Sequence, residues 1–238
     1  MSGARIAVAA TGVANLASIL AALRRTGAEC VPTSDADALA DADLAVLPGV
    51  GTFGAAMAAL RAHGMDRALA DRWKRSAPTL GVCLGMHLFF EDSEESPGTP
   101  GLGILQGRIR RFACALPLPQ LGWNRVASET PAETEAGATA RRDPIPGAIR
   151  EGWAYFANSY RLASAPPGCR SWRSDYGESF VAALEAAGPA AQAPEAAQDA
   201  GAAARPALLL CQFHPELSGR WGLELLTRWV GAPKGAAV

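Results

Sequence analysis

The sequence predicts an α/β fold with a mostly parallel central sheet flanked by helices. In its first half, short apolar runs alternate with segments whose apolar residues recur at helical spacing. This alternation is typical of parallel strands joined by helices. The 238 residues are 49% hydrophobic and 19% charged, a length and composition sufficient to bury one core. We therefore expect a single domain over residues 1–238.

Four strands are expected in the first half. They are the apolar runs Arg5–Ala10, Glu29–Pro32, Ala42–Leu47 and Thr79–Val82. Helices are expected around Asn15–Arg25, along the periodic apolar positions from Met57 to Leu69, and over Leu84–Phe90. Parallel sheets bind ligands beyond the carboxyl ends of their strands, so the loops after these strands are where a site is expected.

The second half is richer in strands and closes with a helix. The expected strands are Ile104–Phe112, Trp123–Val126, Trp153–Tyr160, Ser179–Leu184 and Leu208–Phe213, and the helix is Gly219–Val230. Residues 128–146 are polar and contain Pro, and residues 186–206 are rich in Ala, Gly, Pro and Gln. Because neither segment has a strong period, both are expected to be flexible loops.

Charge and composition exclude several classes of function. The net charge of −1 gives no basic field for nucleic acid. No stretch has the apolar length of a signal peptide or membrane helix, so no membrane contact and a cytoplasmic location are expected. The five cysteines are scattered without a CxxC pair, which argues against disulfides and a zinc site. No metal and no cofactor are expected.

Cys83 is the candidate nucleophile. It lies between Gly81 and Gly85, directly after an expected strand and before an expected helix. The sharp strand-to-helix turn of a nucleophile elbow requires small residues two positions away on either side. There the thiolate is stabilised by helix N–H groups, and the N–H of Leu84 is placed to bind an oxyanion. The alternative, a buried structural Cys between packing glycines, is less favoured in this pattern.

His214 and Glu216 are the candidate base and its orienting carboxylate. His214 ends an apolar strand, and Pro215 biases it toward an extended conformation. Residues two apart in an extended chain point the same way, so the Glu216 carboxylate is expected to hydrogen-bond the imidazole. Read without Cys83, this segment is better interpreted as a strand-end turn with an exposed His and a solvated Glu; with Cys83, the catalytic pair is favoured.

The other two histidines are weaker candidates. His63 precedes Gly64 and is interpreted as a helix C-cap. His87 lies four residues after Cys83 and could face the same site, but it has no evident orienting group. We interpret it as a residue of the substrate pocket or of the helix surface.

A glycine-rich loop follows the strand that ends near Leu47. Gly49 and Gly51 permit backbone angles that can turn an N–H toward a developing oxyanion. The loop lacks the Lys and Ser/Thr of a P-loop. A simple tight turn remains an alternative for this segment taken alone.

Together these motifs resemble the class I, or triad, glutamine amidotransferases, and within them the glutaminase subunit of imidazole glycerol phosphate synthase. The matching stretches are Leu47–Met57, Cys83–Glu95, Gly122–Asn124, Tyr155–Tyr160 and Gln212–Glu216. The resemblance covers nearly the whole chain except residues 128–146 and 186–206. It implies the flavodoxin-like fold of class I glutamine amidotransferases.

The resemblance also implies an activity and roles for individual residues. Cys83 would attack the side-chain carboxamide of L-glutamine, His214 would move the proton, and Glu216 would hold the His214 ring. The ammonia would pass to a (β/α)8-barrel cyclase subunit, forming a heterodimer that makes imidazole glycerol phosphate in histidine biosynthesis. The implied oxyanion residues are Gly49, Val50, Gly51 and Leu84. The implied substrate residues are His87, Glu95, Ser159 and Tyr160, and the implied partner-interface residues are Asn15, Trp123, Tyr155 and Leu217.

Three residues depart from the family pattern. The family usually has Gln at the position of His87, His at Asn158 and Lys at Leu217. The substitutions leave two alternatives open: a non-catalytic subunit that only binds the cyclase, or an amidotransferase-fold subunit with a different specificity. The retained Cys, His and Glu favour the glutaminase.

Overall fold

The computed structural model describes residues 5–10, 12, 16–129, 147–189 and 205–231. Within them, nine strands form one sheet in the order β2-β1-β3-β4-β12-β11-β10-β7-β8. The first five strands are parallel, namely β2 (Glu29–Thr33), β1 (Arg5–Ala9), β3 (Leu44–Gly49), β4 (Thr79–Cys83) and β12 (Leu208–Cys211). The predicted α/β class, with a parallel sheet flanked by helices, is confirmed.

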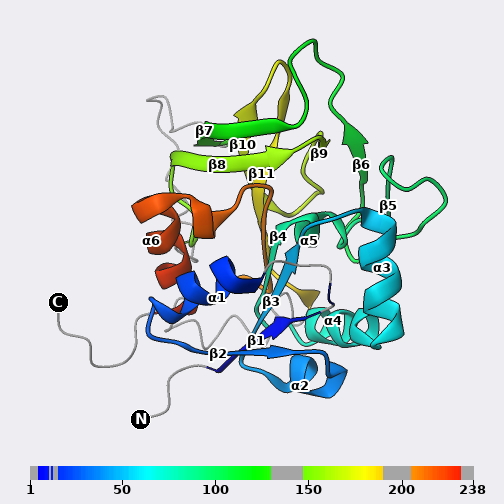
Figure 1. Ribbon diagram of the computed structural model, residues 1–238, viewed down its shortest axis with the longest axis vertical. Helices are drawn as coiled ribbons and strands as arrows, with labels where there is room; N and C mark the ends of the chain where they lie inside the picture. Colours follow the sequence, from blue (N-terminus) through cyan, green and yellow to red (C-terminus); the bar gives the residue numbers. More distant parts are fainter. Residues whose placement is uncertain (1–4, 11, 13–15, 130–146, 190–204, 232–238) are drawn as a thin grey trace, which may run out of the picture.

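The sheet continues from β12 into an antiparallel extension. Its strands are β11 (Ser179–Ala186), β10 (Arg170–Asp175), β7 (Gln120–Ser128) and β8 (Gly152–Asn158). Three short strands form a separate sheet, β5 (Asp92–Ser93), β6 (Arg108–Arg111) and β9 (Tyr160–Leu162). Figure 1 shows β7, β8 and β10 above the parallel strands, so the antiparallel strands extend past the carboxyl ends of β4 and β12.

Helices cover both faces of the parallel strands (Figure 1). One face carries α1 (Leu16–Arg24) and α6 (Gly219–Val230), whose buried residues share one apolar cluster. The opposite face carries α2 (Ala36–Asp41), α3 (Phe53–Ala62) and α4 (Met65–Lys74), whose buried residues belong to a second cluster. Strands covered on both faces are expected to be continuously apolar, and β3, β4 and β12 are buried throughout.

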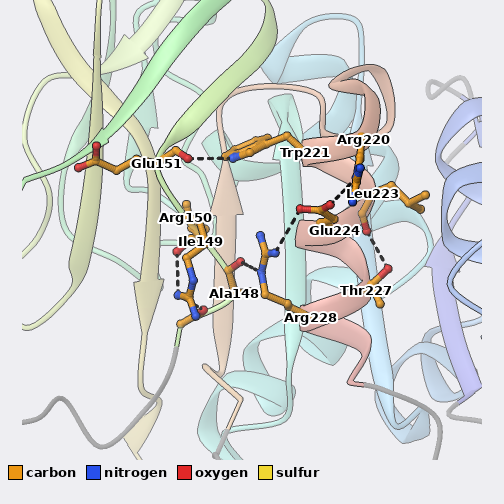
Figure 2. A network of polar contacts seen from close by, with 11 residues as sticks. Ala148, Ile149, Arg150, Glu151, Arg220, Trp221, Leu223, Glu224, Thr227 and Arg228 are labelled. Carbon is orange, nitrogen blue, oxygen red and sulfur yellow. Dashed lines mark hydrogen bonds and ion pairs between the residues drawn. The ribbon is translucent and has the colours of Figure 1, made fainter. Parts of the chain in front are cut away.

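Polar contacts fix α6 against the chain that leads into β8 (Figure 2). Arg228 Nε donates to the carbonyl of Ala148 at 2.7 Å, and Trp221 Nε1 donates to the carbonyl of Glu151 at 3.2 Å. Both bonds satisfy carbonyls outside regular structure, which would otherwise lose hydrogen bonds on burial. Because α6 directly follows His214 and Glu216 in sequence, these contacts also fix the end of that segment.

The predicted strand Ile104–Phe112 is wrong over its first half, because only β6 is strand. The N–H groups of residues 101–105 instead donate to carbonyls of residues 88–91. The same contacts explain why the predicted helix Leu84–Phe90 is shorter, ending as α5 at His87. Carbonyls used by the loop 101–105 are no longer free to continue a helix.

The predicted strand Trp153–Tyr160 is split in two. It pairs with β7 as far as Asn158, and from Tyr160 the chain pairs with β6 as β9. Asn158 Nδ2 donates to the carbonyl of Tyr160 at 3.0 Å, which supports the bend between them. The flexibility predicted for 128–146 and 186–206 concerns segments that lie mostly outside the described residues.

Candidate active site

Cys83 is the last residue of β4 and has a strained backbone. Its φ of 53° and ψ of −113° are rare for a residue other than glycine. Such outliers persist where the surroundings enforce them, as at a nucleophile elbow. A Cβ at Gly85 would lie 1.9 Å from the carbonyl oxygen of Leu47, and one at Gly81 would lie 2.7 Å from Leu210 Cδ2. Both glycines therefore have the steric role that the sequence predicts.

His214 follows β12, the parallel neighbour of β4, so it lies at the same sheet edge as Cys83. Its Nδ1 is 2.9 Å from Glu216 Oε1, and the two side chains are only 9% and 10% exposed. The predicted His–Glu contact is confirmed. The geometry differs from the predicted extended chain, because Glu216 belongs to the one-turn 3-10 helix η3 (Pro215–Leu217).

The surroundings of His214 raise its pKa to about 10. Burial alone would lower the pKa and is the largest single influence. Hydrogen bonds with Cys83 and Glu216, and attraction to both groups, together outweigh it. Both neighbours therefore favour the protonated imidazole.

An open cavity of about 180 Å³ lies beside this group. Its lining residues are Gly51, Cys83, Leu84, His87, Glu95, Pro119, Ala157, Asn158, Ser159 and Tyr160. Seven of the ten are residues that the sequence assigns to nucleophile, oxyanion or substrate roles. A cavity that joins a strained cysteine to several convergent polar groups is the expected form of an active site.

The proposed oxyanion loop packs directly on the nucleophile turn. Gly49 pairs with Cys83 across β3 and β4, and a Cβ there would lie 2.4 Å from the backbone nitrogen of Gly85. Gly51 has a φ of +98° and lines the cavity. Val50, between them, is 41% exposed, whereas Leu84 is buried. The four predicted oxyanion residues are thus adjacent in space, although they come from separate segments.

Glu95 lines the cavity and also caps α3. Its Oε2 accepts the N–H of Phe53 at 2.8 Å, and Ser96 Oγ accepts the N–H of Gly54 at 2.9 Å. Burial raises the pKa of Glu95, and the bond from Phe53 partly opposes this. Helix α3 begins directly after the oxyanion loop, so the capping carboxylate ties that loop to the pocket.

His87 is buried and bonded to a residue that the sequence analysis did not assign to the site. Its Nε2 lies 2.7 Å from Gln212 Oε1, and Gln212 is completely buried. Burial lowers the pKa of His87 to about 4, although the bond to Gln212 acts the other way. An imidazole with so low a pKa is a weak base and a poor proton carrier, which supports His214 in that role. No local signal marked Gln212, because its partner is 125 residues away.

His87→Gln is expected to reduce the loss of stability in acid. The folded-state pKa of His87 lies below the ordinary value of 6.5. The folded protein therefore takes up this proton later than the unfolded chain, and stability falls as pH drops from about 6.5 to about 4. At pH 5 the difference corresponds to about 2 kcal/mol.

Urea unfolding at pH 7 and pH 5 measures this difference. His63→Gln is the control, because His63 is exposed at the C-cap of α3. An equal loss of stability in wild type and His87→Gln would contradict the expectation.

Asn158 presents an unused acceptor at the cavity. It is 5% exposed, and its Nδ2 is engaged by Tyr160. This leaves Oδ1 buried and without a hydrogen-bond partner in the part of the chain that the structure describes. A buried unsatisfied acceptor that lines a cavity is well suited to receive an N–H from a bound molecule.

Two of the predicted interface residues are exposed near the His214 segment, and a third, Tyr155, is half-buried. Trp123 is 54% exposed and Leu217 is 45% exposed. The rings of Trp123 and Tyr155 make an edge-to-face contact across β7 and β8, with centroids 6.3 Å apart. Two further exposed side chains of this hairpin, Leu121 and Trp153, were not predicted. Asn15 lies outside the described residues.

Among the described residues, no helix is both long and apolar enough to cross a membrane.

Comparisons with known proteins give the family of this chain. Residues 5–111 match the family model of the CobB/CobQ-like glutamine amidotransferase domain. The chain is 38% identical over 226 residues to the imidazole glycerol phosphate synthase subunit HisH of Symbiobacterium thermophilum, covering 95% of this chain and 93% of the relative. It is 35% identical over 233 residues to HisH of Halobacterium salinarum, covering 96% and 93%.

Solved structures share the fold at low sequence identity. The structure of PurLQS from Thermotoga maritima superposes with a TM-score of 0.65 at 16% identity, covering 97% of this chain and 98% of that one. A crystal structure of a glutamine amidotransferase gives a TM-score of 0.63 at 17% identity, covering 93% and 98%. The identity and coverage of the HisH relatives decide the assignment: this chain belongs to the HisH family, the glutamine amidotransferase subunits of imidazole glycerol phosphate synthase in histidine biosynthesis.

Proposed function

We propose that this chain hydrolyses L-glutamine to glutamate and ammonia through Cys83, His214 and Glu216, and delivers the ammonia to a (β/α)8-barrel cyclase subunit. One observation carries the proposal. A strained Cys83 lines a cavity next to His214, close enough to raise the pKa of its imidazole, and the His214 ring is in turn bonded to Glu216. This is the relay that thiol-based acyl transfer requires.

In the first half-reaction, the Cys83 sulfur attacks the side-chain carboxamide carbon of glutamine. Cationic His214 beside the sulfur stabilises the attacking thiolate. The carbonyl electrons move onto oxygen, where the N–H of Leu84 and the loop of Gly49 to Gly51 would stabilise the charge. The C–N bond then breaks, the His214 proton passes to the departing nitrogen, and ammonia leaves a glutamyl thioester.

In the second half-reaction, neutral His214 removes a proton from water. The resulting hydroxide adds to the thioester carbon, the C–S bond breaks, and glutamate leaves while His214 is again protonated. Glu216 holds the imidazole through Nδ1 in both steps, which keeps the other ring nitrogen toward the reacting atoms. The carboxylate of Glu95 is suited to pair with the α-ammonium of the substrate.

The apolar surface of Trp123, Tyr155 and Leu217 supports docking of the cyclase. Large exposed apolar side chains gathered at one place mark protein–protein contacts. The HisH relatives are named as subunits of a synthase, which by that name has at least one other subunit. Ammonia released at Cys83 would then be consumed by the partner in forming imidazole glycerol phosphate.

The proposal is tested with glutamine carrying ¹⁵N in its amide, incubated with this chain, the cognate cyclase and the cyclase substrate. An excess of unlabelled ammonium is present. Transfer between the subunits is expected to leave most of the label in the cyclase product, with one glutamate formed per product. Product carrying only unlabelled nitrogen would contradict the delivery of ammonia, and absence of glutamate would contradict the glutaminase.

A further inference from the structure

The backbone of His214 is joined directly to the interface strand β8. The N–H of His214 donates to the carbonyl of Tyr155 at 2.9 Å. The two residues form an isolated antiparallel bridge between β8 and the segment that follows β12. The carbonyl of Tyr155 thus fixes the backbone N–H of His214, the proposed base.

Ser218 completes this link from the other side. Its hydroxyl donates to the carbonyl of His214 at 2.6 Å and accepts the N–H of Tyr155 at 2.9 Å. Ser218 is 1% exposed, so water does not compete readily for these bonds. Three hydrogen bonds therefore connect the backbones of Tyr155 and His214, and two of them pass through one hydroxyl.

The outer end of this link is the exposed aromatic surface. The ring of Trp123 contacts Tyr155 edge-to-face. A Cβ at Gly219, the residue after Ser218, would lie 3.6 Å from Trp123 Cη2. Trp123 thus lies against both segments that the Ser218 hydroxyl joins, while 54% of its own surface is exposed.

We infer that Ser218 is a positioning residue that couples the Trp123–Tyr155 surface to His214. A partner pressing on this surface moves the β8 backbone at Tyr155. The three hydrogen bonds convey that movement to His214, which changes the alignment of its ring with Cys83. This inference rests on the proposed function, because it assigns to the cyclase the role of pressing on that surface.

The inference gives Ser218 a kinetic signature that a purely structural role lacks. The hydroxyl touches the base segment and none of the residues that line the cavity, so Ser218→Ala is expected to lower kcat and leave KM within about 2-fold. A displaced catalytic group typically costs on the order of 10- to 100-fold in rate. The fall in kcat should appear both without and with the cyclase, and the stimulation by the cyclase should fall as well.

A second readout needs no glutamine. The rate at which iodoacetamide alkylates Cys83 is measured against pH. Only the thiolate reacts, and the adjacent His214 influences how much thiolate is present, so the profile reports on His214. In Ser218→Ala the profile is expected to shift along the pH axis, because the His214 ring no longer holds its place. Ser218→Thr keeps the hydroxyl and is expected to restore the wild-type profile.

Ser174→Ala is the matched control. Ser174 is also a buried serine, 5% exposed, but its hydroxyl has no hydrogen-bond partner among the described residues. Its loss is expected to leave both kcat and the alkylation profile unchanged. A general effect of removing a buried hydroxyl would appear in both variants.

Amide hydrogen exchange in the wild type tests the coupling without any substitution, and so covers the case in which Ser218→Ala does not fold. Adding the cyclase is expected to change exchange at Tyr155 and His214 more than in the buried strand β1. Unchanged exchange at both amides would overturn the inference, as would a folded Ser218→Ala with wild-type kcat and stimulation. A wild type without glutaminase activity would instead overturn the proposed function.

Discussion

Replacing Cys83 with Ser is expected to lower the kcat of glutamine hydrolysis by about 10⁴-fold or more. The hydroxyl of Ser is far less acidic than a thiol, so cationic His214 cannot hold it ionised, and removal of a nucleophile in a comparable triad has effects of this size. Steady-state glutamate release, measured with the cyclase present, gives the result.

Stability should change little in Cys83→Ser, because the two side chains are nearly equal in size. Cys114→Ser is the control, since Cys114 is another free cysteine that does not line the cavity. Activity of Cys83→Ser within about 10-fold of the wild type would exclude the thioester route.

Gly85→Ala is expected to damage stability and activity together. A Cβ at this position would lie 1.9 Å from Leu47 O, a backbone atom of the adjacent strand β3. The clash is relieved only if the turn at Cys83 moves away from β3, the strand that leads into the loop of Gly49 to Gly51. Overpacking against backbone is expected to cost about 3 kcal/mol. The same separation should lower kcat, because it moves Cys83 away from Gly49.

Urea unfolding and glutamate release measure the two effects of Gly85→Ala. Gly54→Ala is the comparison, since the nearest atoms to a Cβ there belong to side chains, the closest being Ser96 Oγ at 3.1 Å. Thr99 Oγ1 lies at 3.6 Å, an ordinary contact distance. The expected cost of Gly54→Ala is below about 1 kcal/mol, because side chains yield more readily than backbone. Equal effects of the two substitutions would contradict the close packing of β3 on the nucleophile turn.

The sequence was sufficient to predict those features of the fold and site that depend on residues close together in the chain. The glycines beside Cys83 follow from the sterics of one turn, and the His214–Glu216 contact involves residues two apart. The parallel strands are also recognisable, because burial on both faces makes them continuously apolar. The helix α2 was missed although it had a signal, an Asp35 side chain that accepts two N–H groups at its N-cap.

What the sequence could not supply is contact between distant segments. The bond of His87 to Gln212 and the link from Tyr155 through Ser218 to His214 join residues that are far apart in the chain. Strand β10 was missed because its sequence, Arg-Ser-Trp-Arg-Ser-Asp, is mostly polar and is recruited by its neighbours β11 and β7. Strand pairing of this kind depends on tertiary context more than on propensity.

The central claim is that Cys83 is the nucleophile toward glutamine, and an electrophilic glutamine analogue with a diazoketone in place of the carboxamide tests it most directly. Mass spectrometry of the treated chain is predicted to show one label per molecule, on the Cys83 peptide. Excess glutamine should prevent the labelling, and Cys83→Ser should take up no label. A label on Cys114 or Cys169 instead, or no label on a chain that hydrolyses glutamine, would contradict the account.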